Sequence, residues 1–177
     1  MTSLSISKKL VLKQVVVTVV AVLVAVGLPQ LLHVAGRAAG VDTKLGEMLL
    51  PMHVPVILAG FLGGPIAGLA AGIISPILSY ALSGMPTQMM LPYILIEVVT
   101  YGFAAGMFKN ANMNVTLKVL ACQMAGRIVR AIAILICGTV ASSVIWESVK
   151  IGAVGIVLQL ILVPLILYRV EGKKSAE

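Results

Sequence analysis

One long apolar segment, residues 115–140, carries polar side chains that a membrane-spanning helix ordinarily excludes. Gln123, Arg127 and Arg130 interrupt an otherwise hydrophobic run. At about 100° per residue, these side chains project within about a 60° arc and therefore share one face of a helix. An arginine near the middle of a bilayer costs at least about 2.5–3.5 kcal/mol. The two arginines therefore need a carboxylate, water or an acceptor-rich ligand.

The composition of the whole chain is that of an integral membrane protein. Of the 177 residues, 60% are hydrophobic and 11% are charged, which is more apolar surface than a soluble domain of this size can bury. The length suits a single domain, residues 1–177. The apolar runs predict an all-α bundle of six transmembrane helices, at about 10–32, 49–62, 66–82, 89–108, 115–140 and 149–168.

The distribution of lysine and arginine predicts how these spans are oriented. With six spans, both termini lie on one side, which holds eight basic residues against three on the other. The eight are Lys8, Lys9, Lys13, Lys109, Lys118, Arg169, Lys173 and Lys174, and the three are Arg37, Lys44 and Lys150. This bias places both termini in the cytoplasm of a multi-pass protein of the bacterial plasma membrane. Loops 33–48 and 83–88 then lie outside.

Glu97, in the preceding apolar segment, is the acid expected to face the two arginines. Tyr93, Glu97 and Tyr101 recur every four residues and share a helix face. Glu97 has two possible partners, Arg127 and Arg130, and the pair either locks two helices together or contacts a ligand. One acid does not neutralise two arginines, so the remaining charge favours water or an anionic or acceptor-rich ligand.

Other polar residues in the apolar segments have a structural and a functional interpretation each. Gln123 and Gln159 either hydrogen-bond across helices or contact the ligand. His53 either caps a broken helix end or lines the site. The short segment 49–62 contains prolines, so we expect it to be partly unwound. The candidate substrate-binding residues are Glu97, Arg127, Gln123, Arg130, His53, Tyr93 and Gln159. No histidine or cysteine cluster accompanies His53, so we predict neither a metal site nor a cofactor.

Small residues at four-residue spacing predict close contacts between helices. Gly64, Gly68 and Gly72 form one such stripe, and Gly102 and Gly106 form another. Ala21 and Ala25 form a similar pair in the first span, which serves either internal packing or the docking of a partner helix.

The motifs that would indicate an enzyme are missing from the sequence. Neither GxxxxGK[ST] nor HExxH occurs. An intramembrane serine protease built from His53 with Ser75 or Ser79 would lack a GxSxG elbow. The basic residues lie at span ends and form no patch, which argues against a nucleic-acid partner. We therefore expect no catalytic activity.

Three blocks of sequence resemble the substrate-binding S component of energy-coupling factor (ECF) vitamin transporters. They are LLPMHVPVILAGFLGGPIAGLAAGIISPILSYALSGMP (49–86), IEVVTYGFAAG (96–106) and AGRIV (125–129). The resemblance implies a substrate-binding subunit of an ABC importer that captures a vitamin or vitamin precursor from outside. It also implies three partners, a transmembrane coupling protein and two cytoplasmic ATPases, and a subunit that topples in the membrane to carry the ligand inward.

The same resemblance implies where ligand and partner bind. Ligands of this family lie near the outer face, among the last three spans and the first and third loops, where Glu97, Gln123, Arg127 and Gln159 fit. In the first span, an AxxxA pattern touches the coupling protein, and Ala21 and Ala25 match it. The mixed set of acid, arginine, glutamine and histidine favours hydroxymethylpyrimidine or a form of vitamin B6. Pantothenate, a queuosine precursor and cobalamin stay open. The alternative function is a structural or assembly membrane protein with helix-locking ion pairs and no ligand.

Overall fold

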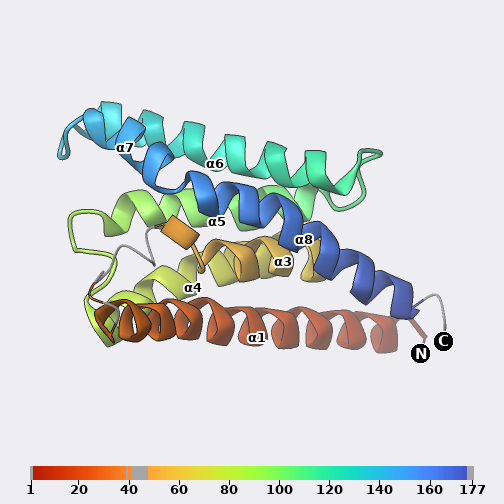
Figure 1. Cartoon of the computed structure of the whole chain (residues 1–177). Helices are drawn as coiled ribbons and strands as arrows, with labels where there is room; N and C mark the ends of the chain where they lie inside the picture. The colour runs from red at the N-terminus through yellow and green to blue at the C-terminus, as the bar shows by residue number, and fades with distance from the viewer. Residues whose placement is uncertain (1, 39, 41–47, 175–177) are drawn as a thin grey trace.

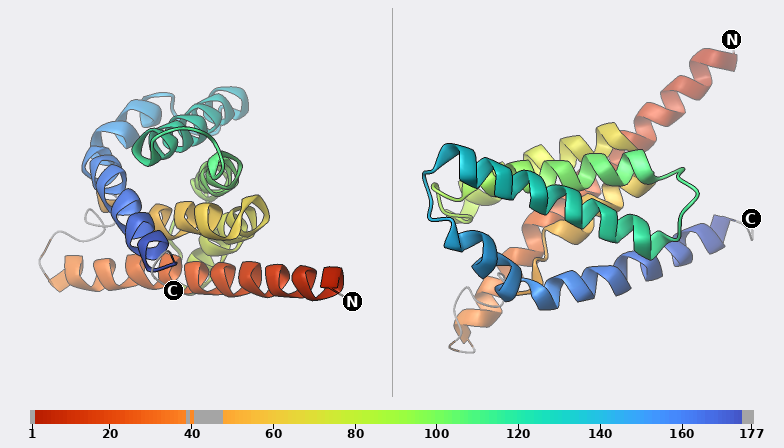
Figure 2. Two further views of the ribbon diagram at one scale, coloured as in Figure 1. Left: turned by 90° about the vertical axis from the view of Figure 1, so that its right-hand side faces the viewer. Right: turned by 90° about the horizontal axis from the view of Figure 1, so that it is seen from above.

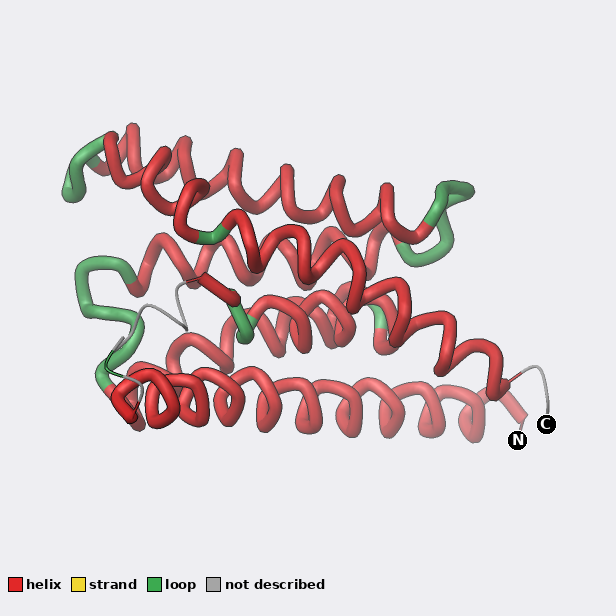
Figure 3. The backbone as a smooth tube through the Cα atoms, in the orientation of Figure 1, coloured by secondary structure: helices red, strands yellow, loops and turns green. Residues whose placement is uncertain are grey.

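The computed structural model describes residues 2–38, 40 and 48–174, and this part of the chain folds into helices without a strand (Figures 1 and 3). The helices are α1 (Thr2–Ala38), α3 (His53–Gly63), α4 (Pro65–Ser83), α5 (Leu91–Phe108), α6 (Val115–Cys137), α7 (Ser143–Ile151) and α8 (Ala153–Lys174). The prediction of an all-α protein is confirmed. Lys44, which entered the charge count, lies outside the described residues.

Five of these helices, α1, α4, α5, α6 and α8, are long and apolar enough to cross a membrane. The remaining predicted span, residues 49–62, corresponds to the shorter helix α3, which has 11 residues. Eleven residues span about 16 Å, whereas the hydrocarbon core is about 30 Å thick. Residues 50–52 precede α3 without helical structure, and Leu50 has φ +49°. The segment is therefore partly unwound, as its prolines predicted.

Two helix boundaries differ from those predicted. Helix α1 continues to Ala38, through the start of the expected loop 33–48. Helix α7 occupies the segment between the predicted spans 115–140 and 149–168 and extends into the start of the second one. Helix α6 ends just before Gly138, which has φ +61°, and Gly152 separates α7 from α8. Between these two glycines, residues 139–151 contain neither glycine nor proline. The polar residues between the two predicted spans are typical of a loop. Because no glycine or proline lies among them, they can also form a short helix.

Helix α5 lies at the centre of the bundle and packs against α3, α4 and α6. Figure 2 shows α1 and α6 on opposite sides of this central layer. Glycines bring α4 and α5 into backbone contact. A Cβ atom added to Gly68 would lie 2.0 Å from the carbonyl oxygen of Gly102, and one added to Gly106 would lie 2.3 Å from the nitrogen of Pro65. The predicted role of both glycine stripes in close packing is confirmed at these positions.

Gly64 is the exception within the first stripe. It precedes α4 with φ +91°, and an added Cβ atom would have one neighbour within 4 Å, the side chain of Gln14 at 3.9 Å. Its role is the turn between α3 and α4, which needs a positive φ angle that residues with a Cβ atom rarely adopt.

Ala21 and Ala25 lie inside the bundle. They are 6% and 0% exposed and belong to a core cluster with Met52, Val56 and Ala59. The small residues allow α1 to approach α3 and α4 closely. Internal packing therefore accounts for the pair in this conformation. Docking of a partner at the same two alanines would require these contacts to open, and it stays a prediction.

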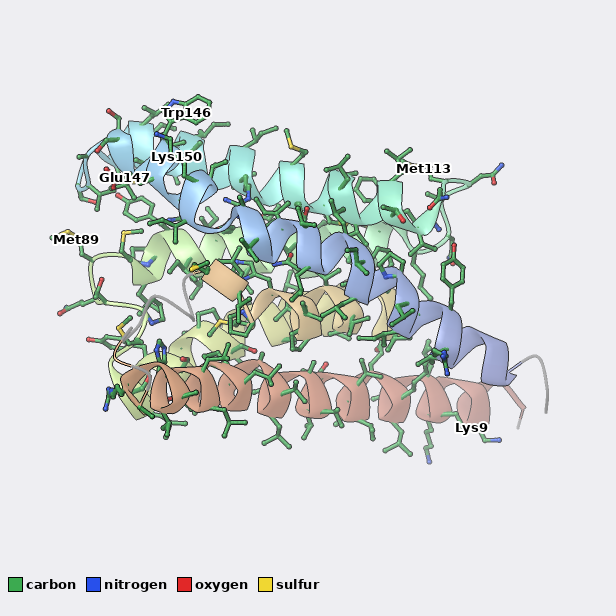
Figure 4. All side chains as sticks on the ribbon, viewed as in Figure 1. Lys9, Met89, Met113, Trp146, Glu147 and Lys150 are labelled. Atoms are coloured by element: carbon green, nitrogen blue, oxygen red, sulfur yellow. The ribbon has the colours of Figure 1, made fainter. Side chains whose placement is uncertain are left out.

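The two ends of the bundle are clearly distinct. The chain termini and the loop between α5 and α6 lie at one end, and the loops that follow α4 and α6 lie at the other (Figure 1). Figure 4 places Lys9 and Met113 at the first end and Met89 and Glu147 at the second. We call the second end the loop end. Short helix α7 covers it on the side of α6.

Candidate functional site

A buried ion pair joins α5 to α6. Arg130 Nη1 lies 2.7 Å from Glu97 Oε2, and the Tyr101 hydroxyl donates a 2.7 Å hydrogen bond to Glu97 Oε1. Glu97 is 1% exposed and Arg130 is 9% exposed. Of the two partners that the sequence allowed, the structure gives Arg130. Both carboxylate oxygens therefore have a partner within the protein.

Gly126 makes this arrangement possible. An added Cβ atom would lie 2.4 Å from Cε1 of Tyr101 and 2.9 Å from the carbonyl oxygen of Glu97. A larger residue at this position of α6 would therefore push the helix away from the tyrosine ring. The glycine lets α6 approach closely enough for Arg130 to reach Glu97.

A cavity of about 310 Å³ lies at the loop end, next to the ion pair. Its wall is formed by the last third of α1, residues 50–53, the end of α4, the 85–90 turn, the start of α5, α6 and α7. Most of the wall is apolar. The polar side chains that line the cavity are His33, His53, Ser79, Thr87, Arg127, Arg130, Glu147 and Ser148. A concave, mostly apolar space with a few converging polar groups is the usual form of a small-molecule site.

Arg127 brings a positive charge to this cavity. Within the described residues it forms no ion pair, and its buried Nε atom has no hydrogen-bond partner. A Cβ atom added to Gly152 would lie 3.3 Å from Arg127 Nη2, so the guanidinium lies beside the junction of α7 and α8. Arg127 precedes Arg130 by about one helical turn but does not share its acid.

His53 contributes a buried imidazole at the start of α3. Its Nδ1 lies 3.2 Å from the carbonyl oxygen of Leu50, and its ring centroid lies 5.2 Å from that of Tyr101. The side chain is 6% exposed, and its Nε2 has no hydrogen-bond partner. His53 is the first residue of α3, but no side-chain cap is formed at the start of this helix, and the residue lines the cavity.

Four of the seven candidate residues lie away from the cavity wall. Glu97 is one of them. Gln123 and Gln159 bind each other, with Gln123 Nε2 donating to Gln159 Oε1 over 2.9 Å. The Tyr93 hydroxyl contacts the Thr139 hydroxyl, which ties α5 to the loop after α6. The structure thus brings His53, Arg127 and Arg130 together at the cavity, and joins the two glutamines elsewhere, between α6 and α8.

Sequence reasoning missed the residues of the turn before α5 and those of α7. Met85, Thr87 and Met90 line the cavity from the turn, and Glu147 and Ser148 line it from α7. The turn was recognised from its breakers, but nothing local shows which side of a loop faces inward. For α7, the sequence signal that could have been used is a run of residues without glycine or proline that ends at Gly152, as a short helix does.

A second, smaller cavity of about 40 Å³ separates α6 from α7. Arg127 and Arg130 line it on α6, and Ile145, Ser148 and Val149 line it on α7. This volume is large enough for an ordered water. Water at this position is therefore an alternative partner for the guanidinium groups.

The residues that a protease would need are not connected. Within the described residues, no hydrogen bond joins His53 to Ser75 or Ser79, and the buried Ser75 hydroxyl has no partner. A search of the same residues also finds no group of three or more potential metal ligands among histidine, cysteine, aspartate and glutamate.

The fold and the cavity define a class of protein: a multi-pass helical membrane protein with a cavity of about 310 Å³ at one end of the bundle. Residues 8–168 match the protein family described as ECF transporter, substrate-specific component. The chain therefore belongs to this family, and the resemblance seen in the sequence is confirmed. Comparison with curated proteins and with solved structures finds no match. Members of the family are substrate-binding subunits of membrane transporters and are not a known enzyme family.

Proposed function

We propose that this chain captures a vitamin or vitamin precursor in the 310 Å³ cavity and delivers it inward with an ATPase-driven partner module. The observation that carries the proposal is the convergence of Arg127 and His53 on an apolar cavity at the end of the bundle remote from the termini. Each residue has a buried nitrogen without a protein partner. Such groups are costly inside a membrane protein unless water or a ligand satisfies them.

The orientation of the chain is part of the same proposal. The bias of basic residues toward the end with the termini favours cytoplasmic termini. In a six-span topology, α3 and the unwound residues before it together form the second span, enclosed by protein. The cavity then opens toward the exterior, where an importer meets its substrate.

The size of the cavity favours a small ligand. Its volume, about 310 Å³, lies at the lower end of the range of about 300–1,000 Å³ that ligand pockets occupy. Hydroxymethylpyrimidine or a form of vitamin B6 has a suitable size, whereas cobalamin is far too large. The partners in this proposal are the coupling protein and two cytoplasmic ATPases, within a lipid bilayer of the bacterial plasma membrane.

Ligand-dependent thermal stabilisation of the purified chain tests this function. Hydroxymethylpyrimidine, pyridoxine and pantothenate are each added at increasing concentration, and the melting temperature is recorded. A ligand at about 100 times its dissociation constant stabilises the folded state by about 2.7 kcal/mol. A saturable rise with one compound supports the proposal.

A second candidate function is a structural membrane protein. The Glu97–Arg130 pair favours it, because both carboxylate oxygens of Glu97 already have partners within the protein. That candidate predicts that no vitamin raises the melting temperature and that the purified chain carries no bound compound. Together, these two results would overturn the proposal of a substrate-binding subunit.

A further inference from the structure

We infer that the ligand is a small organic acid that also carries a hydroxyl or N–H donor. In this arrangement the acid group binds Arg127 and the donor binds Nε2 of His53. The inference rests on the proposed function and adds to it the charge and the hydrogen-bonding pattern of the substrate. Among the vitamins and precursors named above, it favours those with an acid group over hydroxymethylpyrimidine and pyridoxine, which have none. Three observations carry it, in addition to the cavity size given above: the balance of charges, the helix ends at the cavity and the hydrogen bonding of the imidazole.

The balance of charges leaves one guanidinium for the ligand. Arg130 is neutralised by Glu97 at 2.7 Å. Arg127 has no ion pair within the described residues, although Glu147 lines the same cavity. Glu147 is exposed on α7, so water screens its charge. Arg127 is partly buried, and its Nε is fully buried without a partner. A planar guanidinium with free donors is matched by a carboxylate or a phosphate.

Two helices begin at the wall of the cavity. Helix α3 starts next to Met52, and helix α5 starts next to Met90, and both methionines line the cavity. Neither helix start has a side-chain cap. The N-terminus of a helix carries partial positive charge and favours a nearby anion. These two ends act in the same direction as Arg127, so the electrostatic field of the site selects against cations.

His53 defines the second contact. Its Nδ1 faces the carbonyl oxygen of Leu50, which accepts but does not donate a hydrogen bond. Nδ1 therefore carries the hydrogen, and Nε2 of the neutral ring is an acceptor without a partner. A ligand hydroxyl or N–H satisfies it. A simple carboxylate without a hydroxyl or N–H group, such as acetate, satisfies Arg127 but leaves this nitrogen unpaired.

The matched probes are two acids and their corresponding alcohols: pantothenate with pantothenol, and 4-pyridoxate with pyridoxine. Each pair differs in having a carboxylate where the alcohol has a hydroxymethyl group, and all four compounds keep other hydroxyl donors. Dissociation constants are measured by calorimetry on the full chain, for wild type, Arg127→Gln and Arg127→Lys. The matched control is Lys150→Gln, which removes a positive charge from α7 at a residue that does not line the cavity.

We expect at least one acid to bind wild type about 10-fold or more tightly than its alcohol, because a hydrogen bond to a charged group contributes about 1.5–3 kcal/mol. Arg127→Gln removes this preference, Arg127→Lys keeps part of it, and Lys150→Gln leaves it unchanged. His53→Phe weakens both members of a pair by a similar factor, since the donor is common to both.

Equal or tighter binding of the alcohols by wild type overturns the inference and leaves the proposed function standing. A preference for the acid that survives in Arg127→Gln also overturns it, because a group other than Arg127 then recognises the acid. Should neither pair bind, mass spectrometry of the compound retained by the purified chain decides: a compound without an acid group is incompatible with the inference. A chain that retains no compound and responds to no vitamin contradicts the proposed function itself.

Discussion

Arg130 and Glu97 form a buried ion pair, with 2.7 Å between Nη1 and Oε2. The pair joins α6 to α5 next to the cavity and occupies Glu97, the one acid that is buried among the side chains the structure describes. Two arginines line the same cavity, and the pair divides them into one with a carboxylate partner and one without an ion pair among the described residues. This division is the basis of the functional proposal.

Removal of Glu97 should destabilise the fold more than removal of the tyrosine hydroxyl that supports it. Glu97→Ala leaves the buried guanidinium of Arg130 without its partner, which costs about 3–5 kcal/mol. Tyr101→Phe keeps the ion pair and removes one hydrogen bond, at a cost of about 1 kcal/mol. Thermal unfolding in detergent measures both. Equal melting temperatures for Glu97→Ala and wild type would show that the pair does not hold α5 to α6.

The contact between α4 and α5 should be sensitive to a single methyl group. Gly68→Ala places a Cβ atom 2.0 Å from the carbonyl oxygen of Gly102, so the helices must separate, at a cost of at least about 1–3 kcal/mol. Gly27→Ala in α1 is the matched control, because an added Cβ atom there has no neighbour within 4 Å. We expect Gly27→Ala to keep or raise the melting temperature. A similar response of the two variants would contradict the packing described here.

The buried glutamines should support the fold and leave ligand affinity unchanged. Gln123→Leu or Gln159→Leu deprives the other amide of its partner, and hydrogen bonds between membrane helices contribute on average about 0.6 and at most about 1.7 kcal/mol. The double variant should cost less than the sum of the single variants, because it removes both polar groups together. Calorimetry measures the dissociation constant of a vitamin that the wild type binds, for each variant. A weaker affinity for the vitamin in either single variant would show that the glutamines contribute to ligand binding.

Cysteine labelling in intact cells should distinguish the two ends of the bundle. The background is Cys137→Ser, in which the buried Cys122 is retained. Ser142→Cys at the loop end should react with a membrane-impermeant maleimide, and Asn112→Cys at the opposite end should react only after lysis. Both native residues are exposed, so accessibility within the protein is matched. The reverse pattern would place the cavity toward the cytoplasm and contradict import from outside.

Much of the fold was predictable because the membrane restricts what the chain can do. Apolar runs in a bilayer must be helical, so the all-α class and five long helices followed from hydropathy. Glycine spacing located the contact between α4 and α5. Helix α7 was missed because its polar residues resemble a loop, and its identity depends on Gly138 and Gly152 as the stopping points.

Within the site, sequence identified the chemistry better than the geometry. Arg127, Arg130 and Glu97 share faces at a helical period, but the rotation of α6 about its axis decides which arginine meets the acid. That rotation depends on Gly126 and the ring of Tyr101, a contact between distant parts of the chain. Ala21 and Ala25 are a second case in which the sequence does not decide between two arrangements, because the same small-residue pattern suits internal packing and partner docking.

The most direct test of a ligand in the cavity at the loop end uses two neighbouring methionines. Met90 lines the cavity, whereas Met89 is 62% exposed and does not line it. Wild type, Met90→Trp and Met89→Trp are purified under identical conditions, and bound small molecules are quantified by mass spectrometry. The proposal predicts one compound retained by wild type and by Met89→Trp and lost from Met90→Trp, because the larger side chain fills the space. Retention of that compound by Met90→Trp at the level of wild type would contradict binding in this cavity.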